Sequence, residues 1–365
     1  MKIVISKKLL LEVLVDVEKC VSTTCIIPIT GGVLINADKD AITVVSTDTE
    51  KGMRVRCECT VEDKGVAVIP FKKLMGVVRE LSSQNDISIS TSEVRATITS
   101  GHSKFNISLL PSDEFPKIDF DCKGGTEIIV KESDIKKISQ YVSVTTGKDP
   151  SMNVLAGINF VAKNGKVKTS STDRRRLSEF ICDYKGGEFT SSVVVPVETF
   201  MSISGIIADG DGEVKVSTNY NTIFFHKGDK VVCSRLIVGE FPDYSSKLPK
   251  NKHIITFSHS DLVSAVKQVT PFVTQDKFCI KIHAKKEKAI VSIKNESGDA
   301  EVTIPIHQVG GDEIVVGFNS DYLSSFLRVV KGSTVLMEVS DEKGGVVCKT
   351  ENEGGYLSLI MPLVG

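Results

Sequence analysis

An internal repeat of about 126 residues limits the fold of this chain more than any other feature. Ser-Thr-Asp occurs at 46–48 and again at 171–173, and Pro70 stands 126 residues before Pro196. A weaker third copy covers the remainder, where EIVVGFNSDYLSSFLRVV (313–330) takes the place of the proline-led segments. Units this long are whole domains rather than the short units of a solenoid. The chain of 365 residues is therefore expected to contain three similar domains.

Apolar residues recur at i, i+3, i+4 and i+7 in several segments, which is typical of helices with one buried face. The expected helices span 70–82, 132–144, 197–208 and 259–269. Ser133 and Ser260 are predicted N-caps, because a serine hydroxyl can accept a free N–H of the first turn. Pro70 and Pro196 suit first-turn positions, where no N–H is needed.

Strands are predicted where polar and apolar residues alternate, as they do over 86–100 and 212–226. Each copy is expected to open with a helix, continue with strands, insert a second helix midway and close with more strands. This plan predicts an α+β fold in which two helices per domain pack on antiparallel sheets. Polar segments rich in Gly, Pro and Lys mark the boundaries. The predicted domains are 1–122, 123–247 and 248–365.

Charge and cysteine usage restrict the class of protein. The net charge of −1 argues against a domain that holds nucleic acid by bulk positive charge, although basic residues gathered on one surface stay possible. Nine cysteines without a C-x-x-C pair indicate free thiols in a reducing compartment. The sequence has no signal-peptide pattern and no apolar run near the ~20 residues that a membrane helix needs. A cytoplasmic protein is expected.

Catalytic motifs are missing from the sequence. The six histidines form no H-E-x-x-H pattern, and neither a phosphate-binding nor a dinucleotide-binding glycine loop occurs. The run DGDGE (209–213) is interpreted as a turn rather than a calcium loop, because it lacks downstream ligands. Asp48 and Asp173 are interpreted as turn residues that bond the backbone, not as a catalytic carboxylate pair. We therefore predict a non-catalytic protein without metal or cofactor.

Four motifs follow one another along the chain: STDRRRL (171–177), GEFPDYSSKLPKN (239–251), FNSDYL (318–323) and IMPL (360–363). With them the chain resembles, from end to end, the sliding-clamp family, the beta subunits of bacterial DNA polymerase III. The resemblance implies a head-to-tail homodimer, a ring of six domains with helices lining the hole. Such a processivity factor encircles double-stranded DNA without sequence specificity during DNA replication.

The resemblance also implies partners that insert Q-L-x-L-F-like peptides into a hydrophobic cleft between the second and third domains. These partners are the DNA polymerase III alpha subunit, the clamp loader and repair polymerases. The matching cleft positions are Leu155, Thr172, Arg174, Arg175, Arg176, Leu177, Pro242, Lys247, Phe278, Asn319, Tyr322, Lys343, Gly345, Leu359, Ile360, Met361, Pro362 and Leu363.

The arginine triplet departs from the family pattern. Arg174 stands where the family commonly has glycine, and Arg175 where it commonly has histidine. Two interpretations stay open. The extra arginines could make the cleft more basic and favour partner peptides with an acidic residue near the anchor, or they could point to solvent and change nothing.

Basic residues on the predicted helices, and Lys148 in the loop beyond the helix at 132–144, are either solvated or DNA contacts, and the resemblance favours DNA contacts. These residues are Lys72, Lys73, Arg79, Lys136, Lys137, Lys148 and Lys267. The helix at 197–208 departs from this pattern, because it has no basic residue and one acid, Glu198. Family contacts are also in doubt at 22–24, where an arginine is common, and at 152–154, where aromatic residues are common.

Dimer contacts are implied at matching strand positions of the first and third domains. The residues are Phe105, Ile107, Phe272 and Val273, each of which could instead belong to an ordinary core. Two other classes of protein are alternatives to a clamp. An enzyme on the same repeated fold would need a convergent polar cluster, and a scaffold unrelated to DNA would not prefer closed circles to linear DNA.

Overall fold

The computed structural model describes residues 1–22, 27–149, 153–207, 210, 212–245, 248, 253–296, 298–309, 313–340, 344–351 and 353–363. The chain forms two compact units. The first consists of Met1–Ile135, Lys185–Phe189 and Glu198–Leu236, and the second of Lys136–Tyr184, Thr190–Val197 and Ile237–Gly365. The middle repeat therefore contributes strands to both units. The domain boundaries that follow residues 122 and 247 remain predictions.

Six α-helices occur in the part of the chain that the structure describes. They are α1 (Lys7–Val17), α2 (Phe71–Glu80), α3 (Glu132–Lys137), α4 (Val197–Ser204), α5 (His259–Val269) and α6 (Ser320–Val329). Helix α5 has the bounds predicted for it, and α2 and α4 lie within their predicted segments. The segment 132–144 differs, because after Lys137 it continues as a π-helical turn (Ile138–Val142) and a 3-10 turn (Ser143–Thr145).

The predicted helix starts need correction. Ser258, not Ser260, caps α5, and its hydroxyl accepts the N–H of Asp261 at 3.4 Å. Ser133 lies inside α3, which begins one residue earlier. The two prolines end strands instead of entering helices, since Pro70 still pairs with Gly32 and Pro196 with Gly157. In both cases the helix begins at the residue after the proline.

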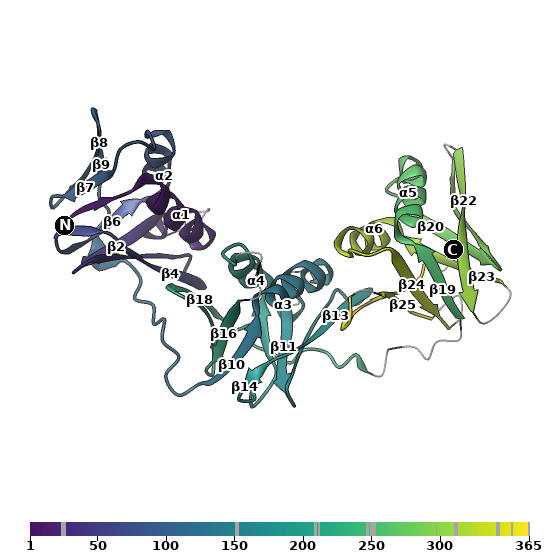
Figure 1. Ribbon diagram of the computed structural model, residues 1–365. Coiled ribbons are helices and arrows are strands. Elements are labelled where there is room, and N and C mark those ends of the chain that lie inside the picture. Colours follow the sequence, from purple (N-terminus) through teal and green to yellow (C-terminus); the bar gives the residue numbers. More distant parts are fainter. Residues whose placement is uncertain are drawn as a thin grey trace. The chain divides into compact units, whose positions relative to one another are not determined.

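The first unit holds two antiparallel sheets. In the five-stranded sheet the order is β5 (Thr60–Asp63), β1 (Lys2–Ile5), β7 (Ile87–Thr91), β8 (Arg95–Ser100) and β9 (Ser103–Ser108). In the nine-stranded sheet it is β14 (Lys185–Gly186), β10 (Thr126–Lys131), β16 (Glu213–Thr218), β17 (Thr222–Lys227), β18 (Lys230–Arg235), β4 (Lys51–Glu58), β3 (Ala41–Thr47), β2 (Gly32–Asp38) and β6 (Gly65–Pro70). Helices α1 and α2 lie side by side (Figure 1) and bury Leu10, Leu14, Leu74 and Val78.

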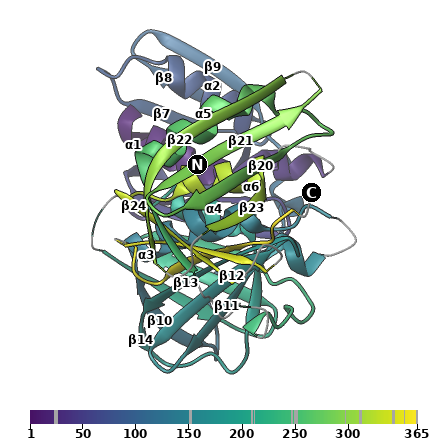
Figure 2. The same cartoon turned by 90° about the vertical axis from the view of Figure 1, so that its right-hand side faces the viewer.

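The second unit holds one sheet of twelve strands. Its order is β15 (Val193–Pro196), β11 (Gly157–Lys163), β12 (Lys166–Thr172), β13 (Arg176–Asp183), β26 (Tyr356–Ile360), β25 (Val346–Thr350), β24 (Thr334–Val339), β19 (His253–Ser258), β22 (Gly298–Val309), β21 (Lys288–Asn295), β20 (Cys279–Lys285) and β23 (Glu313–Asn319). Helix α5 packs on β21 and β22, which cross in front of it in Figure 2. Every strand pair is antiparallel, so the predicted α+β class with helices on antiparallel sheets is confirmed.

Strand pairing continues from one repeat into the next at two places. Strand β18, the last of the middle repeat, pairs with β4 of the first repeat. Strand β26, the last of the third repeat, pairs with β13 of the middle repeat. The equivalent strands β9 and β22 have no such neighbour: among the described strands, none pairs with the outer edge of β9 or with that of β22 over 298–305.

Candidate functional site

The Ser-Thr-Asp turn joins β12 to β13 through side-chain bonds to its own backbone. The Thr172 hydroxyl donates to the carbonyl of Arg176 at 2.7 Å and accepts the N–H of Arg174 at 3.0 Å. Asp173 Oδ1 accepts the N–H groups of Arg175 and Arg176, each at 3.0 Å. Asp173 is therefore a turn residue, as predicted. The turn gives Arg174 a φ of 74°, in the left-handed region that favours glycine.

The first repeat forms the same turn between β3 and β4. The Thr47 hydroxyl donates to the carbonyl of Lys51 at 2.7 Å and accepts the N–H of Thr49 at 2.9 Å. Asp48 Oδ1 accepts the N–H groups of Glu50 and Lys51 at 3.0 and 2.8 Å. Thr49, at the position of Arg174, has a φ of 83°. The prediction for Asp48 is confirmed too, and the repeat extends to single hydrogen bonds.

Arg176 is the structural member of the arginine triplet. Its Nε lies 2.8 Å from Asp173 Oδ2, and its Nη1 donates to the Ser325 hydroxyl at 2.7 Å. The guanidinium lies 4.4 Å from the ring centre of Tyr322, a distance typical of cation–π contact. Because both α6 residues belong to the third repeat, Arg176 links the second repeat to the third.

Arg174 and Arg175 differ from Arg176 in being exposed. In the described part of the chain, neither side chain has an acidic partner within ion-pair distance. The Arg175 carbonyl accepts the N–H of Met361 at 2.9 Å, so the turn runs directly beside the residue that follows β26.

An apolar cluster lies where β13 meets β26. Leu177 and Leu359 face each other in the strand register and are buried together with Val347, while Tyr244, Leu248 and Leu357 pack against them half-buried. These six residues are called the β13–β26 patch. Gly345 lies so close that a Cβ atom there would stand 2.6 Å from Leu359 Cδ1 and 3.3 Å from Met361 Sδ. Met361 itself is 42% exposed at the edge of the patch.

A buried carboxylate fixes the segment that carries Tyr244. Glu179 is only 4% exposed and accepts the Tyr244 hydroxyl at 2.5 Å. Lys168 lies 2.8 Å from the same carboxylate and 5.0 Å from the centre of the tyrosine ring. Burial, and next the hydrogen bond to Glu179, raise the pKa of Tyr244, so the hydroxyl keeps its proton. Sequence reasoning missed Tyr244, Leu248 and Val347, although the first two belong to the motif at 239–251.

The remaining predicted cleft residues fall into smaller groups. Asn319 caps α6 by accepting the N–H groups of Asp321 and Tyr322, and Phe278, 37% exposed, accepts the N–H of Ser320 through its carbonyl. Leu363 donates its N–H to the Gly317 carbonyl at 2.8 Å.

The other predicted cleft residues differ in burial. Ile360 is buried and Pro362 is half-buried. Leu155 is buried and accepts the N–H of Gly147, whereas Pro242 is exposed. Lys247 and Lys343 lie outside the described residues.

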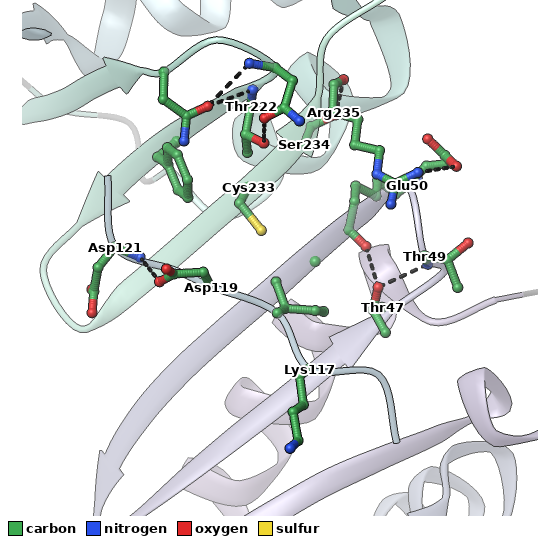
Figure 3. Close-up of a pocket in the computed structure, with 16 residues that line it drawn as sticks. Thr47, Thr49, Glu50, Lys117, Asp119, Asp121, Thr222, Cys233, Ser234 and Arg235 are labelled. Carbon is green, nitrogen blue, oxygen red and sulfur yellow. Dashed lines mark hydrogen bonds and ion pairs between the residues drawn. The ribbon is translucent and has the colours of Figure 1, made fainter. Parts of the chain in front are cut away.

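The equivalent join in the first unit has an apolar cluster of its own with an open pocket beside it. Cys233 is buried with Phe120, Phe224 and Val231, and Ile118 packs against them. Gly52 and Cys233 face each other in β4 and β18, at the places that Leu177 and Leu359 take in β13 and β26. Ile118 covers Gly52, since a Cβ atom there would stand 2.9 Å from Ile118 Cδ1. A pocket of about 310 Å³ lies beside them. Figure 3 shows the Cys233 sulfur pointing into it, with Glu50, Lys117, Asp119 and Arg235 around it. Burial raises the pKa of Cys233 to about 11, so the thiol is unreactive at neutral pH.

The residues predicted to face DNA differ in how free their charges are. Lys72, Lys73, Lys148 and Lys267 are exposed. Arg79 is exposed but pairs with Glu18 at 3.4 Å. Lys136 is half-buried, and Lys137 pairs with Glu353 at 3.1 Å. Helix α4, which has no basic residue, carries Met201, a side chain that is 61% exposed. Among these seven predicted residues, the exposed lysines lie on α2, on α5 and in the loop beyond the turns after α3.

The predicted dimer residues also differ from one another. Phe105 is 37% exposed on the edge strand β9, whereas Ile107 is 4% exposed and belongs to the core of its own unit. Phe272 and Val273 are half-buried after α5. The Phe272 ring lies against Gly298, the first residue of β22. Phe105 and Phe272 therefore stand beside the two strand edges that lack a neighbour.

Metal-ligating groups and apolar helices are also informative about function. No group of three or more His, Cys, Asp or Glu among the described residues is arranged to hold a metal ion. Nor does any of the helices described have the length and apolar character that crossing a bilayer requires.

Comparison with known proteins gives one consistent result. Family models described as "DNA polymerase III beta subunit, N-terminal domain" and "central domain" match residues 1–119 and 129–243. The beta sliding clamp of Proteus mirabilis is 25% identical over 368 residues, with both chains covered completely. A putative DNA polymerase III beta subunit from Eubacterium rectale superposes with a TM-score of 0.93 at 26% identity over the whole of both chains. The Bacillus subtilis DNA polymerase sliding clamp shares the fold, with a TM-score of 0.94 at 22% identity over 100% of this chain and 99% of that one.

Proposed function

This chain belongs to the DNA polymerase III beta-subunit family, the bacterial sliding clamps, and from that premise we propose that it is a non-catalytic ring that encircles duplex DNA and tethers replication proteins to it. The observation that carries the proposal is the strand pairing between successive repeats, which occurs twice and leaves one unpaired edge at each end of the series.

Ring closure follows from those two edges. At each join within the chain, the last strand of one repeat pairs with the fourth strand of the repeat before it. The last strand of the first repeat is β9, and the fourth strand of the third repeat is β22. If β9 of one copy pairs with β22 of another, two copies satisfy both edges and close a six-domain ring. Pairing would also cover strand edges that otherwise favour aggregation.

Double-stranded DNA is the proposed occupant of the ring. Exposed lysines on α2 and α5 supply positive charge without an aromatic ladder, which suits loose contact with phosphates. A ring retains DNA by topology, so it needs no large net charge and is free to slide.

Partner proteins are proposed to dock on the β13–β26 patch through short apolar segments of the Q-L-x-L-F type. The half-buried Tyr244, Leu248 and Leu357 offer an apolar surface over the buried leucines of the patch. Met361 extends this surface toward the basic turn. Burying two anchor side chains contributes roughly 1.5–3 kcal/mol each, which after ordering costs corresponds to affinity on the order of micromolar. The DNA polymerase III alpha subunit, the clamp loader and repair polymerases are the proposed partners.

The deciding experiment compares retention on closed and open DNA. The protein is loaded onto a nicked circular plasmid with clamp loader and ATP, and the DNA is then isolated by gel filtration. A sliding ring stays with the circle and is lost when a restriction enzyme linearises the plasmid. Equal retention on circular and linear DNA would contradict encirclement and favour a scaffold or an ordinary DNA-binding protein.

A further inference from the structure

We propose that Arg174 and Arg175 form a recognition site for acidic residues that flank the apolar anchor of a partner peptide. The inference rests on the proposed function, since it requires a peptide anchored on the β13–β26 patch. The members of the arginine triplet then have different roles. Arg176 links the second repeat to the third, whereas Arg174 and Arg175 bind acidic residues of the partner peptide.

The charge balance around the turn is the first argument. Asp173 is occupied by Arg176 and by two backbone N–H groups. Glu179 is buried and shared between Lys168 and Tyr244. The carboxylates nearest in β13 and its turn are therefore already used within the chain. Two exposed guanidinium groups remain without an acidic partner in the described residues. The edge of the patch thus carries a local positive charge, although the whole chain has a net charge of −1.

The first repeat shows that the turn does not need these arginines. Its turn makes the same four side-chain-to-backbone hydrogen bonds with Thr49 and Glu50 at the matching positions. Both turns hold their first variable residue at positive φ, 83° for Thr49 and 74° for Arg174. Since threonine and glutamate satisfy the turn, its geometry does not account for Arg174 and Arg175. Their chemistry is then directed at something outside the chain.

The location of Arg174 and Arg175 beside the β13–β26 patch indicates that their ligand is a peptide. The Arg175 carbonyl accepts the N–H of Met361, which is exposed at the edge of the patch, and Leu177 follows two residues later. A peptide with apolar anchors on the patch brings its flanking residues within reach of two long side chains. The planar guanidinium pairs with carboxylates through two parallel hydrogen bonds. A DNA backbone also carries anionic oxygens, but it would leave the adjacent apolar cluster unused.

The test uses four labelled peptides and the full-length protein. Gln-Leu-Ser-Leu-Phe carries Asp-Asp before or after the anchor, and matched peptides carry Asn-Asn at the same places. Fluorescence polarisation at low salt is expected to show one Asp-Asp peptide binding roughly five- to tenfold more tightly than its Asn-Asn match. The preference is expected to shrink as salt is raised, because exposed charge pairs are screened.

The variant for this test, called the turn swap, replaces both arginines by the residues of the first-repeat turn. Arg174→Thr with Arg175→Glu installs the residues that the first repeat uses in the same turn, so folding is preserved. This variant is expected to bind the Asn-Asn peptides as the wild type does and to lose the preference for Asp-Asp. The reverse swap in the first repeat, Thr49→Arg with Glu50→Arg, is the matched control and is expected to leave all four affinities unchanged.

Each contrary outcome has a distinct meaning. Equal binding of Asp-Asp and Asn-Asn peptides by the wild type would overturn this inference and leave the proposed function standing. Failure of every peptide to bind would overturn the proposed docking site, and this inference with it. If the turn swap weakened binding of duplex DNA and left peptide preference intact, the arginines would be assigned to DNA instead.

Discussion

At the residue scale, the two Ser-Thr-Asp turns separate what the fold requires from what it tolerates. Threonine and aspartate recur because their oxygens satisfy the N–H groups of a turn that no strand partner reaches. The next residue must adopt a positive φ, yet it is threonine in one turn and arginine in the other. Residues with a Cβ atom are strained at positive φ, whereas glycine is not. The strain is local and has a measurable consequence.

Replacing Arg174 by glycine is expected to stabilise the second unit. Relief of the left-handed strain is worth ~1–2 kcal/mol, and the greater freedom of glycine in the unfolded chain offsets about half of it. The net gain should appear as a higher urea midpoint for Arg174→Gly. Arg175→Gly is the matched control, because Arg175 is not among the residues with positive φ, and it should gain nothing. A control more stable than Arg174→Gly would contradict the strain argument.

The sequence predicted part of this site, for identifiable reasons. Asp173 and Leu177 could be placed because a repeated motif and its flanking strand are local features. The pairing of Leu177 with Leu359 spans 182 positions of the chain and depends on a strand register that alternation alone does not specify. The separate tasks of Arg176 and its two neighbours were not predictable, because they depend on Ser325 and Tyr322 in a helix of another repeat.

At the element scale, α3 and α5 show the difference between local and tertiary control. Helix α5 has an N-cap, an apolar stripe and a clear end, and its predicted bounds agree with the structure. The helix predicted at 132–144 instead changes to π and 3-10 geometry after Lys137. There Tyr141 stacks on Tyr356 at 4.6 Å, and the Ser171 hydroxyl donates to the carbonyl of Val142. Such long-range contacts change the helical geometry in a way that apolar spacing does not reveal.

Tyr356 should be essential to the join between the second and third repeats. Its ring lies between Tyr141 and Phe326, with centroids at 4.6 and 6.2 Å, and is 4% exposed. Tyr356→Ala removes a large buried ring, and losses of this kind cost ~3–5 kcal/mol. Tyr356→Phe keeps the ring and removes the hydroxyl, whose contact with Ser178 is long, at 3.5 Å. Urea unfolding should therefore separate the two variants clearly, and equal losses would refute the stacking argument.

At the scale of the whole molecule, buried thiols link stability to pH in both units. Burial raises the pKa of Cys57 and Cys233 to about 11, and that of Cys20 and Cys348 to about 12, from an ordinary value of 9.0. Below pH 9 the thiols are neutral in both the folded and the unfolded chain. Above pH 9 the unfolded chain releases protons that the folded chain retains, so the free energy of unfolding falls as pH rises.

Stability is therefore expected to decline between about pH 9 and pH 11, faster than surface charge alone would cause. The unfolding midpoint in urea, measured from pH 7.5 to 10.5, checks this. Cys348→Ala should be less stable than the wild type at pH 8, because it leaves a cavity, but should lose less on going to pH 10.5. An unchanged pH dependence in this variant would show that other groups, such as buried tyrosines, control the alkaline range.

The unpaired edges of the described strands β9 and β22 lead to a prediction about dimer formation. Phe272 supports the start of β22 through its contact with Gly298, and Phe105 is exposed on β9. We expect Phe272→Ala with Val273→Ala to weaken the proposed pairing of β22 with β9 of a second copy, and light scattering should then report the mass of one 39.6 kDa chain instead of two. Val238→Ala, at a residue that is 93% exposed, is a truncation control that should remain dimeric.

A monomer should also lose retention on circular DNA while still binding the anchor peptide, because the β13–β26 patch lies within one chain. A double variant with unchanged mass would rule out this edge as the dimer contact.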